Sequence, residues 1–221
     1  MKKSIALAAF VAVSSLFIIG CSKDDTEAPI ITITGSNPLQ LEMLQTYTEL
    51  FATADDNEDG DITSSINIDA SEIENRLPGT YNVYYSVSDA AGNPADAIRE
   101  VVVFATNDAL AKNYSVVDSC FTSSGTFAVL FNYSQSLTAS GANTNTYSLF
   151  ANYSGLTPAI NSTVNGSGLI TLASQTATDG IGDTHTFSGT AQITTSGFKL
   201  TYTDINITTS DTAFCKAYYT R

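Results

Sequence analysis

The segment PGTYNVYYSVSDAAGN, residues 78–93, decides the fold of the first half of this chain. After the turn at residues 78–80, apolar residues recur at every second position: Tyr81, Val83, Tyr85 and Val87. A period of two places these four side chains on one face of a β-strand. Residues 88–93 contain the Gly and Asn typical of a hairpin loop. The segment therefore predicts a half-buried strand that enters an antiparallel hairpin.

The flanking sequence continues this pattern in both directions. Ile31 and Ile33 alternate with threonines, Ile66 and Ile68 repeat the alternation, and residues 101–104 form an apolar strand. Residues 54–61 are a polar turn, and the apolar stretch of residues 39–51 continues the second strand. Turns at intervals of roughly ten residues favour an antiparallel sandwich.

Four short motifs occur here in a fixed order: EAPI at residues 27–30, DGDIT at 59–63, PGTY at 78–81 and SDAAGN at 88–93. This order resembles the bacterial surface Ig-like domain, a family that also occurs in pesticidal crystal proteins. The resemblance implies an Ig-like β-sandwich over residues 29–105, and such modules often serve as spacers. Residues 43–51 depart from the family pattern, so we expect the second strand to bend differently.

The start of the chain predicts its location. Two lysines and an apolar run over residues 5–19 precede Gly20 and Cys21, an arrangement that resembles a bacterial lipoprotein signal. It implies removal of residues 1–20 and lipidation of Cys21. The alternatives are an ordinary secretory signal and a single membrane anchor, although the run is shorter than the roughly 20 residues that span a bilayer.

Residues 21–28 form an acidic tether. The sequence Ser22-Lys23-Asp24-Asp25 resembles the surface-export signal of Bacteroidetes lipoproteins. We therefore expect a lipid-anchored outer-membrane protein that faces outward; the alternative is that these charges are only a solvated linker.

The second half predicts a further all-β domain over residues 113–221, joined by a linker over residues 106–112. Its clearest hairpin turns at Ser196-Gly197 between two alternating segments. The domain is a small antiparallel β-meander, either a sandwich or a lipocalin-like barrel. The apolar phase shifts after Asp204, which predicts a bulge or strand break there.

Parts of this half, at residues 186–191, 200–203 and 215–221, resemble the C-terminal β-domains of small Bacteroidetes surface lipoproteins. Those domains follow one Ig-like module, as here. Genes for such proteins often accompany outer-membrane nutrient importers, so the resemblance implies an importer as a partner.

Charge and cysteines separate the two halves further. Residues 22–106 hold sixteen acidic and three basic residues, whereas residues 107–221 hold six and four. An acidic half next to the anchor argues against nucleic acid as a partner. Outside the cytoplasm, where disulfides persist, Cys120 and Cys215 form either a bridge between the ends of the second domain or two buried thiols.

The acidic turn raises the question of a metal. Asp55, Asp59 and Asp61 supply the oxygen ligands that Ca²⁺ prefers, so one hypothesis is a loose calcium site. The alternative is that these residues favour the turn itself, with Asp61 capping backbone donors. No other cofactor is predicted.

No catalytic set emerges from the sequence, and we predict that the protein is not an enzyme. His185, the single histidine, follows a Gly-Asp turn and is interpreted as a surface or turn residue. Four tyrosines of the second half are candidates for stacking on a ligand, with packing within strands as the alternative: Tyr114, Tyr133, Tyr147 and Tyr153. Asp211-Thr212-Ala213 resembles a Bacteroidetes O-glycosylation motif, which makes Thr212 a candidate acceptor.

Together these features predict a non-catalytic outer-membrane surface lipoprotein. In this hypothesis an Ig-like spacer presents a β-domain that binds a nutrient, glycan or peptide, or docks on an outer-membrane importer. The alternative is a structural or adhesive cell-envelope protein without a small-molecule ligand.

Overall fold

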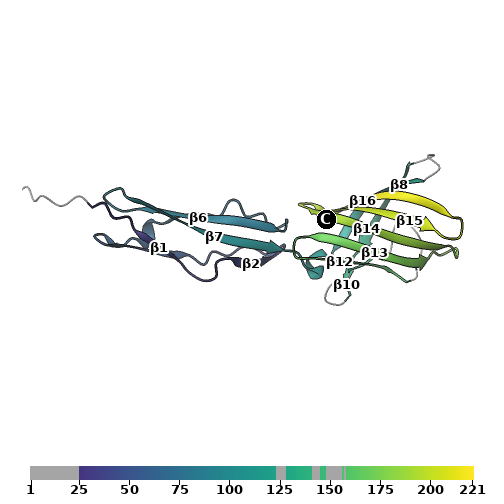
Figure 1. The fold of residues 1–221 in the computed structure, drawn as a ribbon, viewed down its shortest axis with the longest axis horizontal. Helices are drawn as coiled ribbons and strands as arrows, with labels where there is room; N and C mark the ends of the chain where they lie inside the picture. The colour runs from purple at the N-terminus through teal and green to yellow at the C-terminus, as the bar shows by residue number, and fades with distance from the viewer. Residues whose placement is uncertain (1–24, 123–127, 141–144, 148–155, 157) are drawn as a thin grey trace, which may run out of the picture.

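The computed structural model describes residues 25–122, 128–140, 145–147, 156 and 158–221. These residues form two β-domains that lie end to end, with the tether at one extremity (Figure 1). Cys21 and the leader lie outside the described residues. Within the described part of the chain, no helix is long and apolar enough to cross a membrane.

The first domain contains two sheets, as the sandwich prediction requires. The smaller has the order β1-β3-β4 and consists of β1 (Ile30–Ile33), β3 (Ala52–Asp56) and β4 (Gly60–Asp61). The larger has the order β2-β7-β6-β5 and consists of β2 (Leu39–Glu42), β7 (Pro94–Phe104), β6 (Gly79–Ser88) and β5 (Asn67–Asp69). Strands β2 and β7 pair in parallel, and the other pairs are antiparallel. A single 3₁₀ turn, η1 (Thr63–Ser65), connects β4 to β5.

The decisive segment forms the hairpin that its period predicts. Strands β6 and β7 pair from Gly79–Val103 to Ser88–Pro94 without a break. Val83, Tyr85 and Val87 are buried, and Tyr81 is half-buried. Alternation therefore placed the core face of this strand correctly.

The departure from the family pattern at residues 43–51 has a structural counterpart. The second strand ends at Glu42, and no strand forms again before Ala52. Leu44 and Phe51 have φ angles of 73° and 62°, in the left-handed region that most residues avoid. The apolar residues of this segment thus belong to a loop that crosses between the sheets, and the prediction of a continuing strand was wrong.

The second domain begins with a short helix, α1 (Asn107–Leu110), whose first turn is capped by the Thr106 hydroxyl accepting from the Ala109 amide. One nine-stranded sheet follows, in the order β10-β11-β12-β13-β14-β15-β16-β8-β9. Its strands are β8 (Asn113–Thr122), β9 (Ala128–Ser136), β10 (Thr138–Ala139), β11 (Asn145–Tyr147), β12 (Ile160–Val164), β13 (Leu169–Thr178), β14 (Thr184–Thr194), β15 (Gly197–Asn206) and β16 (Asp211–Thr220). The all-β class and the antiparallel meander are confirmed.

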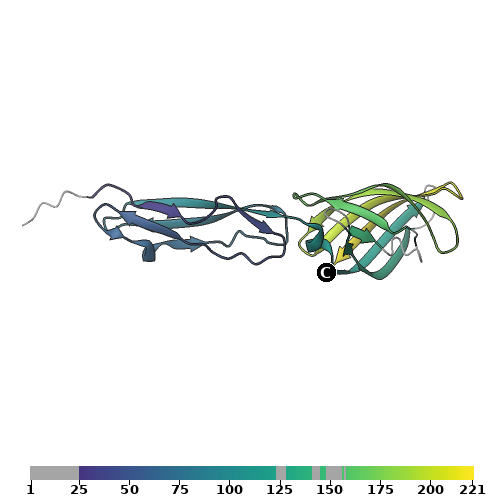
Figure 2. The same cartoon turned by 90° about the horizontal axis from the view of Figure 1, so that it is seen from below.

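This sheet is curled, and its two edge strands are consecutive in the sequence. Strands β9 and β10 occupy opposite ends of the strand order, yet only Leu137 separates them in sequence. Figure 2 shows the strands of this domain curving around a common interior. In β8, β14, β15 and β16, buried side chains recur at alternate positions over most of the strand and point into that interior.

The disulfide joins β8 and β16, which are the first and last strands of the second domain in the sequence. Strands β16 and β8 are hydrogen-bonded neighbours, and their register places Cys215 directly opposite Cys120. The two sulfur atoms are bonded. Of the two alternatives, the bridge between the ends of the domain is therefore the one that the structure contains.

The irregularity predicted near Asp204 is absent. Strand β15 pairs regularly on both sides through Asn206, and Asp204 occupies an inward position in phase with Tyr202. The apparent phase change arose because a buried acid interrupts the apolar series, while Ile205 and Ile207 point outward. The actual register shift lies in β13, between Leu172 and Gln175.

Candidate functional site

The two domains meet at the turn between β12 and β13. The Ala105 amide, just after β7, donates to the Gly166 carbonyl at 3.0 Å. Within the turn, the Asn165 side chain accepts from the Leu169 amide at 2.9 Å. Gly168 has a φ of 82°, and a Cβ there would lie 2.8 Å from Pro78 Cγ of the first domain. A glycine is thus required both by the turn and by the close approach of the domains.

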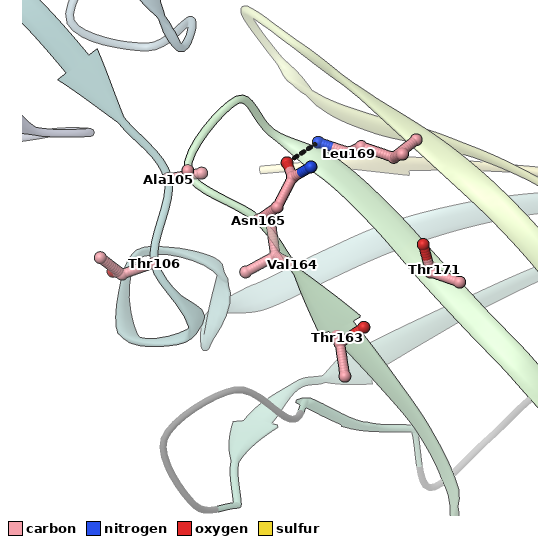
Figure 3. A pocket seen from close by; sticks show the side chains of 8 residues that line it. Ala105, Thr106, Thr163, Val164, Asn165, Leu169 and Thr171 are labelled. Atoms are coloured by element: carbon pink, nitrogen blue, oxygen red, sulfur yellow. Dashed lines mark hydrogen bonds between the residues drawn. The ribbon is translucent and has the colours of Figure 1, made fainter.

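A cavity of about 480 Å³ opens beside this joint (Figure 3). It is lined by the connector and by both strands of the β12–β13 hairpin: Ala105, Thr106, Thr163, Val164, Asn165, Gly166, Leu169 and Thr171. These described residues supply hydroxyl, amide and apolar groups, and none of them has an ionisable side chain.

A second cavity, of about 240 Å³, adjoins the first on the same hairpin. Its lining residues are Asn161, Ser162, Thr163, Thr171, Ala173 and Gln175, so Thr163 and Thr171 line both cavities. We call the two cavities together the joint groove.

The joint groove exists because β12 and β13 separate. They pair at Thr163–Thr171 and Val164–Ile170, and just beyond these pairs β13 shifts its register against its other neighbour, β14. The Gln175 side chain bonds to the β12 backbone there: its Oε1 accepts from the Asn161 amide at 2.8 Å, and its Nε2 donates to the Asn161 carbonyl at 2.6 Å. A side-chain amide thereby pairs both backbone groups of Asn161 beyond the end of the ladder.

The floor of the groove offers hydrogen-bonding groups to a ligand. Thr163 and Thr171 are directly opposite each other and exposed. In the described part of the chain, neither hydroxyl has a hydrogen-bond partner, whereas the side chains of Gln175, Asn165 and Thr106 are engaged locally. Two adjacent hydroxyls, each able to donate and accept, suit a neutral polar ligand.

A second group of polar residues lies inside the curled sheet and is sealed from solvent. Asp118 is 0% exposed, and its Oδ2 accepts from the Tyr202 hydroxyl at 2.6 Å and from the Tyr133 hydroxyl at 3.4 Å. Burial raises the pKa of Tyr202 well above its ordinary value, and the negative charge of the nearby Asp118 carboxylate raises it further. Tyr202 therefore stays protonated and remains a donor to Asp118.

His185 belongs to the same interior, and its interpretation as a surface or turn residue was wrong. It is 2% exposed, and its Nδ1 lies 2.8 Å from Asp204 Oδ1 on the neighbouring strand. Its Nε2 lies 3.7 Å from Asp179 Oδ2, and its ring stacks on Phe187. Burial raises the pKa of Asp179, but backbone hydrogen bonds outweigh that effect, so this pKa lies below its usual range. A histidine between two carboxylates without solvent access is suited to fixing the sheet rather than to proton transfer with a substrate.

Tyr114 and Tyr133, two of the four tyrosines predicted to stack on a ligand, do not line the joint groove. Tyr114 is buried, donates to the Leu110 carbonyl at 2.9 Å and packs edge-on against Phe198 and Tyr219, so its proposed ligand contact was wrong. Tyr133 points toward Asp118. Tyr147 has only its backbone described, and Tyr153 lies outside the described residues.

Two of the three acids predicted to bind calcium, Asp59 and Asp61, accept hydrogen bonds from backbone amides. Asp55 and Asp61 are exposed partners across β3 and β4. Asp61 Oδ1 accepts from the Thr63 amide at 2.9 Å, and Asp59 Oδ2 accepts from the Ala90 amide at 2.6 Å. These bonds match the alternative reading in which the acids organise the turn. Thr212, the candidate glycosylation residue, is half-buried in β16.

Sequence reasoning missed the joint groove. Thr163 and Thr171 look like ordinary strand threonines, and Gln175 gives no local sign that its side chain bonds to the β12 backbone. The Asn165-Gly166-Ser167-Gly168 turn was the only available signal, because it marks the tip that meets the first domain.

Comparisons with known proteins agree with this architecture. Residues 31–103 match the family described as bacterial surface protein, Ig-like domain, so this segment is a domain of that family. No curated protein matches the chain significantly. The resemblance noted for the first half is confirmed.

Several solved structures are similar over most of the chain. A lipoprotein from Bacteroides thetaiotaomicron is 18% identical with a TM-score of 0.37, over 87% of this chain and 100% of that one. A protein of unknown function from Bacteroides ovatus is 8% identical with a TM-score of 0.38. The similarity covers 86% of this chain and 74% of that one. A third structure holds the CBM51-2 and INT domains of ZmpB from Clostridium perfringens in complex with GlcNAc. It is 17% identical with a TM-score of 0.29, and the similarity covers 87% of this chain and 44% of that one.

Proposed function

We propose that this protein is a non-catalytic surface lipoprotein whose second domain binds a neutral glycan in the joint groove. Lipid on Cys21 would anchor it in the outer membrane, and the Ig-like domain would act as the spacer. The observation that carries the proposal is that both cavities share Thr163 and Thr171, whose hydroxyls have no hydrogen-bond partner among the described residues.

The chemistry of the groove favours a glycan over other ligands. The lining residues that the structure describes carry no charge, which argues against phosphorylated or strongly acidic ligands. Hydroxyls and amides beside small apolar side chains match the mixed polar and apolar surface of a sugar. Because the described lining residues include no aromatic platform, we expect modest affinity and recognition through hydrogen bonds.

A glycan array tests this proposal, with the complete chain from residue 22 applied to neutral oligosaccharides and to peptides. We expect binding to at least one neutral glycan. The double variant Thr163→Val/Thr171→Val keeps the shape of the groove and removes both hydroxyls, so affinity should fall about tenfold or more.

The matched control is Thr201→Val, which removes an exposed threonine hydroxyl from β15. Its affinity should stay within about twofold of the unmodified protein, as surface changes away from a site usually do. Absence of any neutral glycan among the bound ligands would contradict the proposal, as would unchanged affinity of the double variant.

A second candidate function is docking on an outer-membrane importer, favoured by an apolar patch on the outer face of the second domain. Phe121 and Phe214 lie directly opposite each other there and are 54% and 56% exposed. Val117 and Tyr218 form a second exposed apolar pair on the same two strands, separated from the first by the outward pair of Ser119 and Lys216. Exposed apolar side chains gathered on one pair of strands are typical of protein contacts.

Co-purification tests this candidate. Phe121→Ser/Phe214→Ser should abolish recovery of an importer identified by mass spectrometry, whereas Ile98→Ser, an exposed apolar residue of the first domain, should not. Retention of the importer by the double serine variant would contradict docking through this patch. A protein that binds neither glycan nor importer would fit the alternative, a structural or adhesive envelope component.

A further inference from the structure

Three acids gather at the end of the first domain that receives the tether. Asp25 lies in the tether, Asp56 ends β3, and Asp89 begins the β6–β7 turn. One carboxylate oxygen from each lies within 4.8 Å of the others. Asp56 is 5% exposed and Asp89 is 8% exposed, so two of the three charges are withdrawn from solvent.

The Asp56 carboxylate points into this cluster with one oxygen unsatisfied. Its Oδ2 accepts from the amides of Glu58 and Asp59 at 2.9 and 3.0 Å. Its Oδ1 is buried and has no hydrogen-bond partner in the described part of the chain. Leaving a buried carboxylate oxygen unpaired is costly, which indicates that a positive group normally contacts it.

No basic side chain from residue 25 onward that the structure describes fills that role. The ion pairs among the described residues involve Arg99 and His185, and none involves Asp25, Asp56 or Asp89. Three carboxylates are thus brought together without a compensating cation among the described residues. Since mutual repulsion would separate them, their arrangement favours an external positive charge.

Neutral donors hold the cluster in place. Asn93 Nδ2 donates to Asp89 Oδ2 at 2.7 Å and to the carbonyls of Asp25 and Glu27 at 3.3 and 3.2 Å. The Asn93 amide donates to Asp89 Oδ1 at 2.7 Å. This asparagine therefore binds the tether to the β6–β7 turn while leaving the acids uncompensated.

We propose that Asp25, Asp56 and Asp89 bind a calcium ion that fastens the tether to the base of the Ig-like domain. All candidate ligands are oxygens, the donors that hard cations select. Calcium–oxygen distances of about 2.3–2.6 Å place opposite ligands about 4.6–5.2 Å apart, which agrees with the spacing in the cluster. A bound ion would fix the direction in which the stalk leaves the membrane, independently of any ligand in the joint groove.

Calorimetric titration of the complete chain from residue 22 with CaCl₂ tests the site. We expect one ion per chain with a Kd of about 10⁻⁴ to 10⁻³ M, as in other extracellular calcium modules. Asp56→Asn and Asp25→Asn should each weaken binding by about tenfold or more, because affinity follows the number of charged ligands. Asp25 precedes the first strand, so its variant remains informative even where Asp56→Asn perturbs folding.

The matched control is Asp55→Asn, which removes an exposed carboxylate one residue from Asp56. Its affinity for calcium should be unchanged. The proposal is overturned by a flat titration up to about 20 mM CaCl₂, well above the range of such modules. Equal loss of affinity in Asp55→Asn, or equally tight binding of Mg²⁺, would also overturn it.

Discussion

The two domains differ in the sign of their most deeply buried charge. The core of the Ig-like domain holds a cation, Arg99, which is 0% exposed. The curled sheet buries the acids Asp118 and Asp204 instead, together with His185. The first domain uses its buried charge to hold loops, whereas the second uses its charges to join strands.

Arg99 connects segments that have no strand pairing of their own. Its guanidinium donates to the carbonyls of Ser36 and Thr34 at 2.8 and 2.7 Å, and its Nε donates to the Tyr85 hydroxyl at 3.0 Å. A planar group with five donors suits this task, because it satisfies several carbonyls at once. The short strands of this domain therefore depend on a buried cation for the order of their loops.

The curled sheet needs no such clamp, since its long strands pair over ten residues and a disulfide joins β8 to β16. Its buried acids contact side chains of other strands, as in the contact between Asp118 and Tyr202 across 84 residues of sequence. From this difference we expect the stability of the first domain to depend on the charge of Arg99, and that of the second domain to depend on the disulfide.

The largest expected effect follows from replacing Arg99, the buried cation that holds the loops of the first domain. Arg99→Met removes the cation but keeps most of its volume, and it leaves several buried carbonyls without donors. We expect the first domain to lose about 3–5 kcal/mol of its free energy of unfolding. Chemical denaturation of the complete chain, followed by tyrosine fluorescence, measures this loss.

Arg76→Met is the control, because Arg76 is exposed and forms no ion pair within the described residues. It should change stability by less than about 0.5 kcal/mol. Similar losses in both variants would show that Arg99 is not a specific clamp.

The next effect concerns the second domain alone. Cys120→Ser/Cys215→Ser should cost about 2–5 kcal/mol, the usual range for a native disulfide in a small domain. Differential scanning calorimetry should show a lower transition temperature for the second domain and an unchanged one for the first. A shift of both transitions together would contradict the separation of the domains in this account.

A smaller effect tests the buried acids. Tyr202→Phe removes the hydroxyl that donates to Asp118 and should destabilise the second domain by about 1–3 kcal/mol. Tyr218→Phe, at an exposed position of the neighbouring strand, should have no measurable effect in the same denaturation experiment. Equal stability of the two variants would mean that the Asp118 contact does not contribute.

The smallest expected effect is on pH dependence, through Glu49. Burial raises the pKa of Glu49, but hydrogen bonds from Tyr47 and Tyr85 outweigh it, aided by the Phe51 amide and the charge of Arg99. The pKa in the folded protein therefore lies below its ordinary value. Its contribution to stability is present above the ordinary glutamate pKa of about 4.3 and is lost as pH falls through the lower folded value.

Glu49→Gln should accordingly flatten the acid side of the stability profile of the first domain. Thermal unfolding between pH 7 and acid conditions measures the slope, with Glu72→Gln, an exposed acid, as the control. A slope that persists in Glu49→Gln and disappears in the control would contradict the assignment.

The sequence predicted the elements better than it predicted their polar contacts. Alternation identified β6 and the hairpin of β14 and β15 because one face of each strand is apolar. It failed at Asp204 and His185, since a buried polar residue at an inward position is indistinguishable in sequence from a turn residue. Whether such a residue is buried depends on partners 19 or more positions away, as in the contacts of His185 and Tyr202.

The candidate sites depended even more on tertiary structure. The cysteine pair was predictable from its place in the first and last strands, but the joint groove depends on Gln175 reaching across to Asn161. The acids predicted to share a metal were neighbours in sequence, while the cluster that the fold assembles comes from three separate segments. Contacts across long loops cannot be read from local patterns.

The central claim is that the joint groove binds a neutral glycan, and NMR mapping with the strongest glycan from the array tests it most directly. The account predicts chemical-shift changes confined to β12, β13 and the connector at Ala105 and Thr106, largest at Thr163 and Thr171. Changes elsewhere on the domain, with none at these two threonines, would contradict it.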